Sequence, residues 1–252
     1  MIKIYYSETA KDAGKLAADV IVNAVKANPD ATLGLATGSS PLDMYAELAA
    51  RYAAGEVSFK NVKTVNLDEY VGLTPDHDQS YAYFMKTNLF DKIDVLPENT
   101  NIPSGIAPDA DKERARYDAL LDSIGGVDVQ VLGIGNNGHI GFNEPSDVFS
   151  YGTILVNLTD STIDANQRFF KSRDEVPTKA ISMGIGHIMT AKTIVLLANG
   201  KGKAEILERS LFGDVTPEVP ASILRFARDV RVFADKDALS VIMEKHPEAV
   251  IK

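Results

Sequence analysis

A glycine-rich segment, GIGNNGHIGFNEP (residues 133–145), contains the residue types and spacing best suited to chemistry. His139 follows the glycines, and Glu144 comes five residues later. A histidine with its ordinary pKa of ~6.5 both takes and gives a proton at neutral pH. A carboxylate on the second ring nitrogen would fix the tautomer and stabilise the imidazolium, as in a catalytic triad without its nucleophile. An isolated histidine is more often structural, but this context favours acid–base catalysis.

The same glycines match the dinucleotide-binding pattern G-x-G-x-x-G, and Asp160 lies roughly 20 residues beyond them. This interpretation fails on context, because such a loop opens directly into a helix and Pro145 precludes a regular helix here. Glycines in such a loop let the backbone approach a ligand or adopt unusual dihedral angles. The segment therefore indicates a ligand site of another kind.

Two adjacent carboxylates, Asp68 and Glu69, follow an apolar run over residues 62–67. Each of them suits either a helix cap or a general base. The residue types alone leave both alternatives open for both positions.

A second glycine-containing turn, TGSSP (residues 37–41), leads into an expected helix. Ser40 is predicted to be its N-cap, and Asp43 would complete a capping box. The free N–H groups of a helix start, together with the hydroxyls, also suit a phosphate. From these residues alone, simple capping and phosphate binding are equally good interpretations.

The segment GKGK contains two lysines, Lys201 and Lys203, just after an apolar run over residues 193–198. It is not a Walker A loop, because G-x-x-x-x-G-K-[ST] does not occur. Such lysines are usually solvated, but their place after a strand makes one of them a candidate phosphate ligand. Arg168 is a further candidate, on a weaker signal.

Short apolar runs alternate with helical patterns, which predicts a single α/β domain over residues 1–252. The repeated β-then-α order predicts a mostly parallel, doubly wound (Rossmann-like) sheet with helices on both faces. Ligands bind beyond the carboxyl ends of such strands, where the polar and glycine-rich clusters described above fall. We expect strands over residues 2–6, 32–37, 62–67, 127–132, 152–157, 193–198 and 231–234, helices over 79–90, 109–123, 160–171, 201–211 and 236–245, and surface loops over 94–108 and 143–152.

The composition narrows the class of protein. The 252 residues carry a formal net charge of −9, which argues against nucleic acid or an anionic membrane as a main partner. Cysteine is absent, which excludes disulfides, thiolate nucleophiles and cysteine-based metal sites. The histidines form no i, i+4 pair, so we expect no metal site. With no secretion signal or long apolar segment recognised, we expect a cytoplasmic location.

Motifs along the chain form a recognisable set: LATGSSP (35–41), VNLDEYVGL (65–73), GIGNNGHIGFNEP (133–145), ANQRFF (165–170) and ANGKGKA (198–204). Together they resemble the glucosamine-6-phosphate deaminase family, in order and over essentially the whole chain. NLDEY and GHIGFNEP are specific, whereas TGSSP is shared with wider relatives. The resemblance implies conversion of glucosamine 6-phosphate and water to fructose 6-phosphate and ammonia, with no cofactor.

The resemblance also implies roles for individual residues. Asp68 would move the C2 proton to C1, His139 would open the sugar ring, and Glu144 would support His139. Lys203 is preferred to Lys201, because it fits the family's G-x-x-K-A spacing. The substrate phosphate would be held by Thr37, Gly38, Ser39, Ser40, Arg168 and Lys203.

The sequence departs from the family at Asn137, a candidate catalytic residue, where well-known members have Asp. An asparagine can orient the imidazole but cannot balance its charge, so Glu144 would carry more of that role. The family also implies a mobile lid around residues 158–175, which would bring Arg168 to the site on closure. Because the chain is shorter at its C-terminus than the allosteric, hexameric members, we expect a monomer or small homo-oligomer without activation by N-acetylglucosamine 6-phosphate.

Two alternatives compete with this interpretation. A 6-phosphogluconolactonase would have a similar fold and phosphate loop, but it opens an ester and needs no base at Asp68. A non-catalytic sugar-phosphate sensor of the kind found in transcription regulators usually carries an N-terminal helix-turn-helix. Here the sequence starts with an expected strand, and its acidic charge does not suit DNA.

Overall fold

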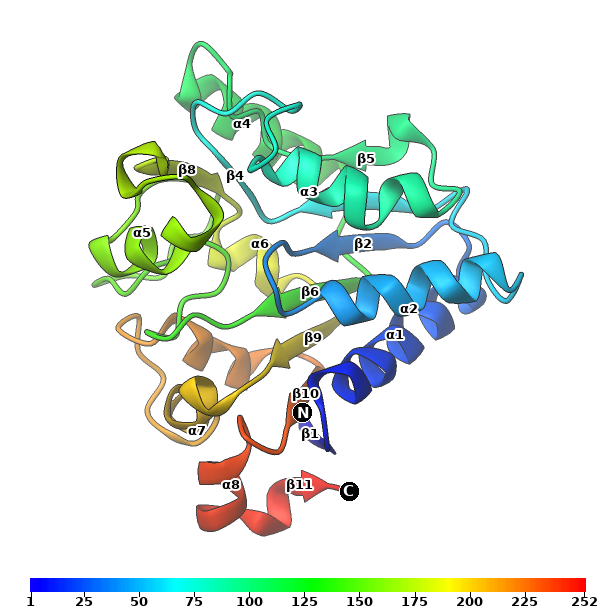
Figure 1. The fold of residues 1–252 in the computed structure, drawn as a ribbon, viewed down its shortest axis with the longest axis vertical. Coiled ribbons are helices and arrows are strands. Elements are labelled where there is room, and N and C mark those ends of the chain that lie inside the picture. The colour runs from blue at the N-terminus through cyan, green and yellow to red at the C-terminus, as the bar shows by residue number, and fades with distance from the viewer.

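The computed structural model describes residues 1–160, 162–164, 166–168 and 170–252. Within these ranges, eight parallel strands form the main sheet in the order β11-β1-β10-β9-β6-β2-β3-β5 (Figure 1). Because the strands are parallel, all their carboxyl ends lie at the same edge. The strands are β1 (Ile2–Ser7), β2 (Thr32–Leu35), β3 (Lys63–Asn66), β5 (Thr100–Asn101), β6 (Val129–Gly133), β9 (Thr193–Ala198), β10 (Val230–Asp235) and β11 (Val250–Ile251).

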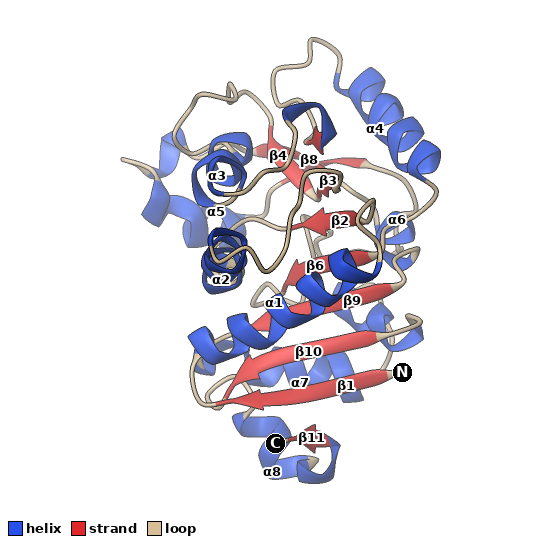
Figure 2. Ribbon diagram, turned by 90° about the vertical axis from the view of Figure 1, so that its right-hand side faces the viewer, coloured by secondary structure: helices blue, strands red, loops and turns tan.

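Helices cover both faces of the main sheet. In Figure 2, α1 lies in front of the sheet and α7 behind it, and α2 packs alongside α1. The chain runs outward from β2 to β3 and then returns through β6 to β9 and β10. Because parallel crossovers are right-handed as a rule, this change of direction places helices on both faces. The helices are α1 (Ala10–Ala27), α2 (Leu42–Ala53), α3 (Tyr81–Asn88), α4 (Ala110–Ile124), α5 (Asp160–Asn166), α6 (Ile185–Met189), α7 (Ala204–Phe212) and α8 (Ser240–Lys245).

A smaller antiparallel sheet accompanies the main one, in the order β4-β8-β7. It consists of β4 (Asp68–Tyr70), β8 (Lys179–Ser182) and β7 (Ile154–Asn157). The chain between β7 and β8 forms α5 and the short turns η3 (Gln167–Phe169) and η4 (Arg173–Glu175). We refer to residues 158–175 as the α5 segment; positions 161, 165 and 169 of this expected lid lie outside the described residues.

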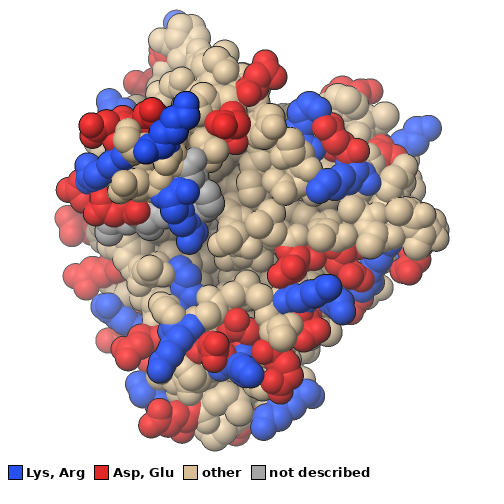
Figure 3. Space-filling model, in the orientation of Figure 1, with Lys and Arg blue, Asp and Glu red and all other residues tan. Residues whose placement is uncertain are grey.

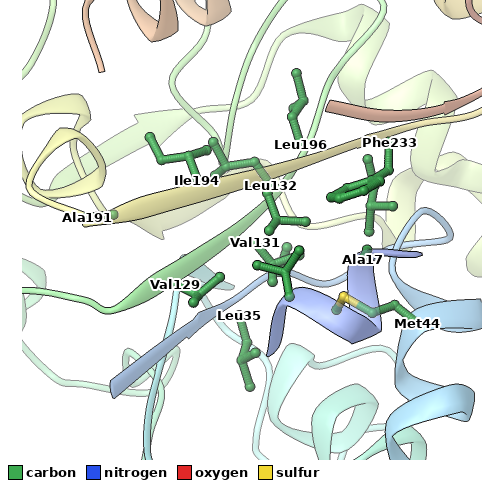
Figure 4. Packing of buried hydrophobic residues seen from close by; sticks show 14 of the residues in the cluster. Ala17, Leu35, Met44, Val129, Val131, Leu132, Ala191, Ile194, Leu196 and Phe233 are labelled. Carbon is green, nitrogen blue, oxygen red and sulfur yellow. The ribbon is translucent and has the colours of Figure 1, made fainter. Parts of the chain in front are cut away.

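The two sheets have separate hydrophobic cores. The main core fills the space between the large sheet and its helices, and Figure 4 shows Leu35 of β2, Val131 of β6 and Leu196 of β9 among its side chains. The small core lies under the α5 segment and contains Tyr70, Phe142, Leu158, Ile163, Val176 and Ala180. The active-site candidates lie where these two units meet.

The predicted fold class is confirmed, including the parallel main sheet with helices on both faces. All seven predicted strands are present. The loop expected over residues 94–108 contains β5, which pairs with β3, and the short edge strand β11 was not predicted. Strands β4 and β8 were also not predicted, because such short segments give no hydrophobic periodicity. No helix in the part of the chain that the structure describes is long and apolar enough to cross a membrane.

Candidate active site

The loops after four neighbouring strands meet at one edge of the main sheet. Strands β9, β6, β2 and β3 are consecutive in the sheet, and they lead into residues 199–203, 133–145, 37–41 and Asp68, respectively. In Figure 3 the surface between α5 and these strand ends is hollowed, with Lys and Arg side chains at its edge. The fold therefore gathers the residues that the sequence singled out as candidates.

The structure separates the two adjacent carboxylates. Glu69 accepts hydrogen bonds from the backbone N–H groups of Tyr70 at 2.8 Å and of Tyr81 and Ala82 at 2.9 Å, so it fixes the start of α3. Asp68 is 6% exposed and accepts no hydrogen bond from any residue that the structure describes. Burial, and then the charge of Glu69, raise the pKa of Asp68 to about 8. Asp68 can therefore exchange a proton near neutral pH, whereas Glu69 is committed to the backbone.

The glycine-rich loop passes directly against Asp68. Strand β4 pairs Asp68 with Ser182 of β8, and Ser182 Oγ accepts a hydrogen bond from the N–H of Phe142 at 3.0 Å. Gly141 has a φ of +55°, in the left-handed region that favours glycine. A Cβ at Gly141 would lie 3.1 Å from Ser182 Oγ and 3.5 Å from Asp68 Oδ2. Glycine at this position therefore lets the loop approach the carboxylate.

His139 and Glu144 form an ion-pair contact in this loop. His139 Nδ1 lies 3.4 Å from Glu144 Oε2, and a Cβ at Gly135 would overlap the imidazole at 2.4 Å. Burial raises the pKa of Glu144, but the hydrogen bonds and charge of His139, with hydrogen bonds from Thr162 and Asn137, outweigh burial and lower it. Glu144 is therefore ionised at neutral pH, and its negative charge faces the imidazole of His139.

Asn137 contacts Glu144 rather than the imidazole that it was expected to orient. Its Nδ2 donates to Glu144 Oε2 at 2.7 Å, and its Oδ1 accepts the backbone N–H of His139 at 3.2 Å. Among the described atoms, no hydrogen bond joins Asn137 to the imidazole. An aspartate here would hold a second negative charge against Glu144, so asparagine suits a site in which Glu144 is the carboxylate that faces His139.

Thr162 of α5 is a site residue that the sequence reasoning missed. It is 6% exposed, and its Oγ1 donates to Glu144 Oε1 at 2.5 Å. The two residues are far apart in sequence, and no motif links them. The signal available was only that Thr162 falls within the expected lid.

The turn after β2 supplies the candidate phosphate loop. Gly38 has a φ of +92°, so this position also favours glycine. The predicted capping role of Ser40 is wrong: Pro41 occupies the N-cap of α2, and no side chain caps it. Ser40 instead lies against β6, since a Cβ at Gly133 would be 3.5 Å from its Oγ. The N-terminus of α2 therefore keeps N–H groups that a phosphate could accept from, and Thr37 and Ser39 flank Gly38 in the same turn.

The structure distinguishes Lys203 from Lys201. Lys203 is half-buried and its Nζ donates to Asn136 Oδ1 at 2.6 Å, whereas Lys201 is exposed. Burial, and then the positive charge of Arg168, lower the pKa of Lys203. Arg168, from the α5 segment, therefore acts on Lys203, which lies in the turn after β9. Two neighbouring cations are typical of an anion site.

The described residues contain no group of three or more His, Cys, Asp or Glu side chains arranged to hold a metal ion. The chemistry that these side chains support is proton transfer beside an anion site.

Comparisons with known proteins find related sequences and related folds. A family model described as glucosamine-6-phosphate isomerases/6-phosphogluconolactonase matches residues 6–233. A protein of Clostridium perfringens (strain SM101) named glucosamine-6-phosphate deaminase is 48% identical over 241 residues, covering 96% of this chain and 100% of the relative. A solved structure described as a monomeric glucosamine-6-phosphate deaminase superposes with a TM-score of 0.93 at 44% identity, covering 95% of this chain and 99% of the other. A 6-phosphogluconolactonase from Thermotoga maritima shares the fold, with a TM-score of 0.75 at 19% identity, covering 94% and 100%.

Proposed function

The chain belongs to the family of glucosamine-6-phosphate isomerases and 6-phosphogluconolactonases, and we propose that it converts glucosamine 6-phosphate and water to fructose 6-phosphate and ammonia. Full-length similarity to relatives named as deaminases supports this reaction. The observation that carries the choice is Asp68, a buried carboxyl without a hydrogen bond from any described residue and with a pKa raised to about 8. Removal of a proton from carbon needs such a base, and hydrolysis of a lactone does not.

The substrate phosphate binds at the turn after β2. The backbone and hydroxyls of Thr37, Gly38, Ser39 and Ser40 surround it, and Lys203 and Arg168 balance its charge. The turn belongs to the main sheet, whereas Arg168 comes from the α5 segment. This position is remote from the reacting carbons, so binding energy at the phosphate is available to orient the sugar.

His139 opens the pyranose ring. It takes the proton of the C1 hydroxyl and returns a proton to the ring oxygen, which gives the open-chain aldehyde. Glu144 stabilises the imidazolium formed between these two transfers, because it is ionised and lies 3.4 Å from Nδ1. Asn137 holds the Glu144 carboxylate through its 2.7 Å hydrogen bond.

Asp68 carries out the isomerisation. Its carboxylate removes the proton at C2, the C1 oxygen takes up the electrons together with a proton from water and becomes a hydroxyl, and the proton on Asp68 returns to C1. The nitrogen on C2 then becomes an iminium, to which water adds, and ammonia leaves. The substrate's own carbonyl serves as the electron sink, so no cofactor enters the scheme. Acid–base steps of this kind contribute roughly 10²–10⁴-fold each.

We also propose that the protein acts as a monomer. This proposal is supported by the 44% identical structure that is described as monomeric.

Turnover of glucosamine 6-phosphate tests the proposal. The purified protein should release ammonia and fructose 6-phosphate in equal amounts at neutral pH, with no added cofactor or metal. The same preparation should not increase the rate at which 6-phosphogluconolactone hydrolyses spontaneously. Lactone hydrolysis without ammonia release would reject the deaminase and establish the alternative.

A further inference from the structure

We propose that Thr162 is a positioning residue through which the α5 segment sets the orientation of Glu144 for proton transfer by His139. The inference rests on the function proposed above and assigns a part of that reaction to a residue outside the recognised motifs.

The carboxylate of Glu144 is held on both oxygens by different parts of the chain. Oε1 accepts the hydroxyl of Thr162 at 2.5 Å, whereas Oε2 accepts Asn137 Nδ2 at 2.7 Å and lies 3.4 Å from His139 Nδ1. The hydroxyl of Thr159 in turn donates to Thr162 Oγ1 at 3.1 Å. A carboxylate fixed at one oxygen can still rotate, but a carboxylate fixed at both presents Oε2 to the imidazole in one direction.

The hydroxyl of Thr162 reaches Glu144 only when the α5 segment is in place. Asn166 Nδ2 donates to the hydroxyl of Tyr70 at 2.9 Å, and the ring of Phe170 meets that of Tyr70 edge-on at 6.0 Å. Tyr70 belongs to β4, the strand that carries Asp68. The segment is therefore anchored beside Asp68, and at the same time it positions Glu144, the partner of His139.

The same segment brings a cation to the phosphate end of the site. Arg168 lies in the turn that directly follows α5, and its charge acts on Lys203. One short piece of chain thus contributes a positive charge at one end of the substrate and a hydroxyl that orients Glu144 at the other.

Loss of the Thr162 hydroxyl should change proton affinity as well as rate. Among the described residues, His139 is the one titratable group that acts on Glu144, and Thr162 and Asn137 are its neutral donors. A donor to an ionised carboxylate stabilises the form of the pair that has lost its proton. Without this donor the His139–Glu144 pair binds a proton more tightly, whichever residue receives it, so the pH profile moves to higher pH.

The experiment compares Thr162→Val with Thr162→Ser and with the control Thr178→Val. Thr178 is an exposed threonine that lies just before β8 and outside the site. We expect Thr162→Val to lower kcat by about tenfold, the effect of one hydrogen bond to a charged group. It should also raise, by about 0.5–1 pH unit, the lower apparent pKa in the acid limb of kcat/KM, which belongs to the His139–Glu144 pair, and leave the pKa of about 8 of Asp68 in place. Thr162→Ser should restore both, and Thr178→Val should match the wild type. Inhibition by inorganic phosphate should be unchanged in all three variants, because the described hydrogen bonds of the Thr162 side chain go to Glu144 and Thr159 and not to the proposed phosphate residues.

Two results would overturn the inference while wild-type turnover stands. One is wild-type kinetics in Thr162→Val; the other is a lower kcat in which the apparent pKa of the His139–Glu144 pair has not moved or serine gives no rescue, which would mean that Thr162 only packs. Thermal unfolding of each variant separates a folding defect from a catalytic one, and Thr162→Ser remains informative if the valine variant does not fold. Absence of turnover by the wild type would instead reject the proposed function.

Discussion

The two sides of the candidate site are built from units of different size. The phosphate turn and Lys203 extend from strands of the main sheet, which is backed by the large core. Asp68, Thr162 and Arg168 belong to the small sheet or the α5 segment, which share a much smaller core. The difference teaches how the proposed work can be divided: the proposed phosphate site lies on a well-packed frame, and the proposed base lies on a smaller unit.

The glycine-rich loop joins the two sides. Asn136 holds Lys203 on the side of the main sheet, and Glu144 receives Thr162 on the other. Gly141 allows the middle of the loop to approach Asp68. A small residue is needed at Gly141 because a side chain there would lie against Ser182 and Asp68.

The largest predicted effect on catalysis concerns Asp68, on the side of the site formed by the small sheet and the α5 segment. Asp68→Asn should reduce kcat by about 10²–10⁴-fold, because it removes the base and leaves the phosphate side intact. Wild-type kcat/KM should rise as the pH passes through about 8, where Asp68 ionises. Initial rates over a pH series measure both, with Glu69→Gln as the matched control. A wild-type profile that is flat through this range would argue against Asp68 as the base.

The same pair of variants should differ in stability. Asp68 stays protonated in the folded protein up to about pH 8 but ionises near pH 4 when unfolded, so it lowers stability as the pH rises through that window. Asp68→Asn should therefore raise the unfolding temperature at pH 8 and leave it unchanged at pH 4. Glu69→Gln should lower the free energy of unfolding by about 1–3 kcal/mol, since Glu69 accepts backbone hydrogen bonds at the start of α3. Thermal and urea unfolding measure these effects; destabilisation by Asp68→Asn at pH 8 would contradict the assignment.

A smaller effect of a different kind is expected on the main-sheet side. Lys203→Met should raise KM and the inhibition constant for inorganic phosphate by about tenfold, while kcat changes less. The exposed Lys201 provides the control, because Lys201→Met should behave like the wild type. Steady-state kinetics of the two variants suffice. An equal effect of both would mean that only the general positive charge of this loop matters.

The smallest effect is predicted at an anchor of the α5 segment. Tyr70→Phe removes the hydroxyl that accepts Asn166 Nδ2 but keeps the ring contacts with Tyr81 and Phe142. Stability should fall by about 1 kcal/mol or less, and kcat/KM by a few-fold, because the segment is held less firmly. Limited proteolysis within residues 158–175 should become faster. Protection equal to that of the wild type would show that aromatic packing alone holds the segment.

The sequence predicted the six longer strands of the main sheet and the positions of its functional loops, because parallel strands and their following loops have clear patterns. It did not predict the two-residue strands β5 and β11. It could not separate Asp68 from Glu69, since that depends on where the N–H groups of α3 point. It wrongly predicted that Ser40 caps α2, because serine suits both a helix cap and a phosphate ligand. It missed Thr162, whose contact with Glu144 depends on how the small sheet folds back over the loop.

Ammonia release from glucosamine 6-phosphate by the wild type, Asp68→Asn and Glu69→Gln, measured side by side, tests the central claim most directly. We predict that the wild type and Glu69→Gln release ammonia, whereas Asp68→Asn falls to background and still binds inorganic phosphate with the affinity of the wild type. Activity retained in Asp68→Asn, or absence of ammonia from the wild type, would contradict the account.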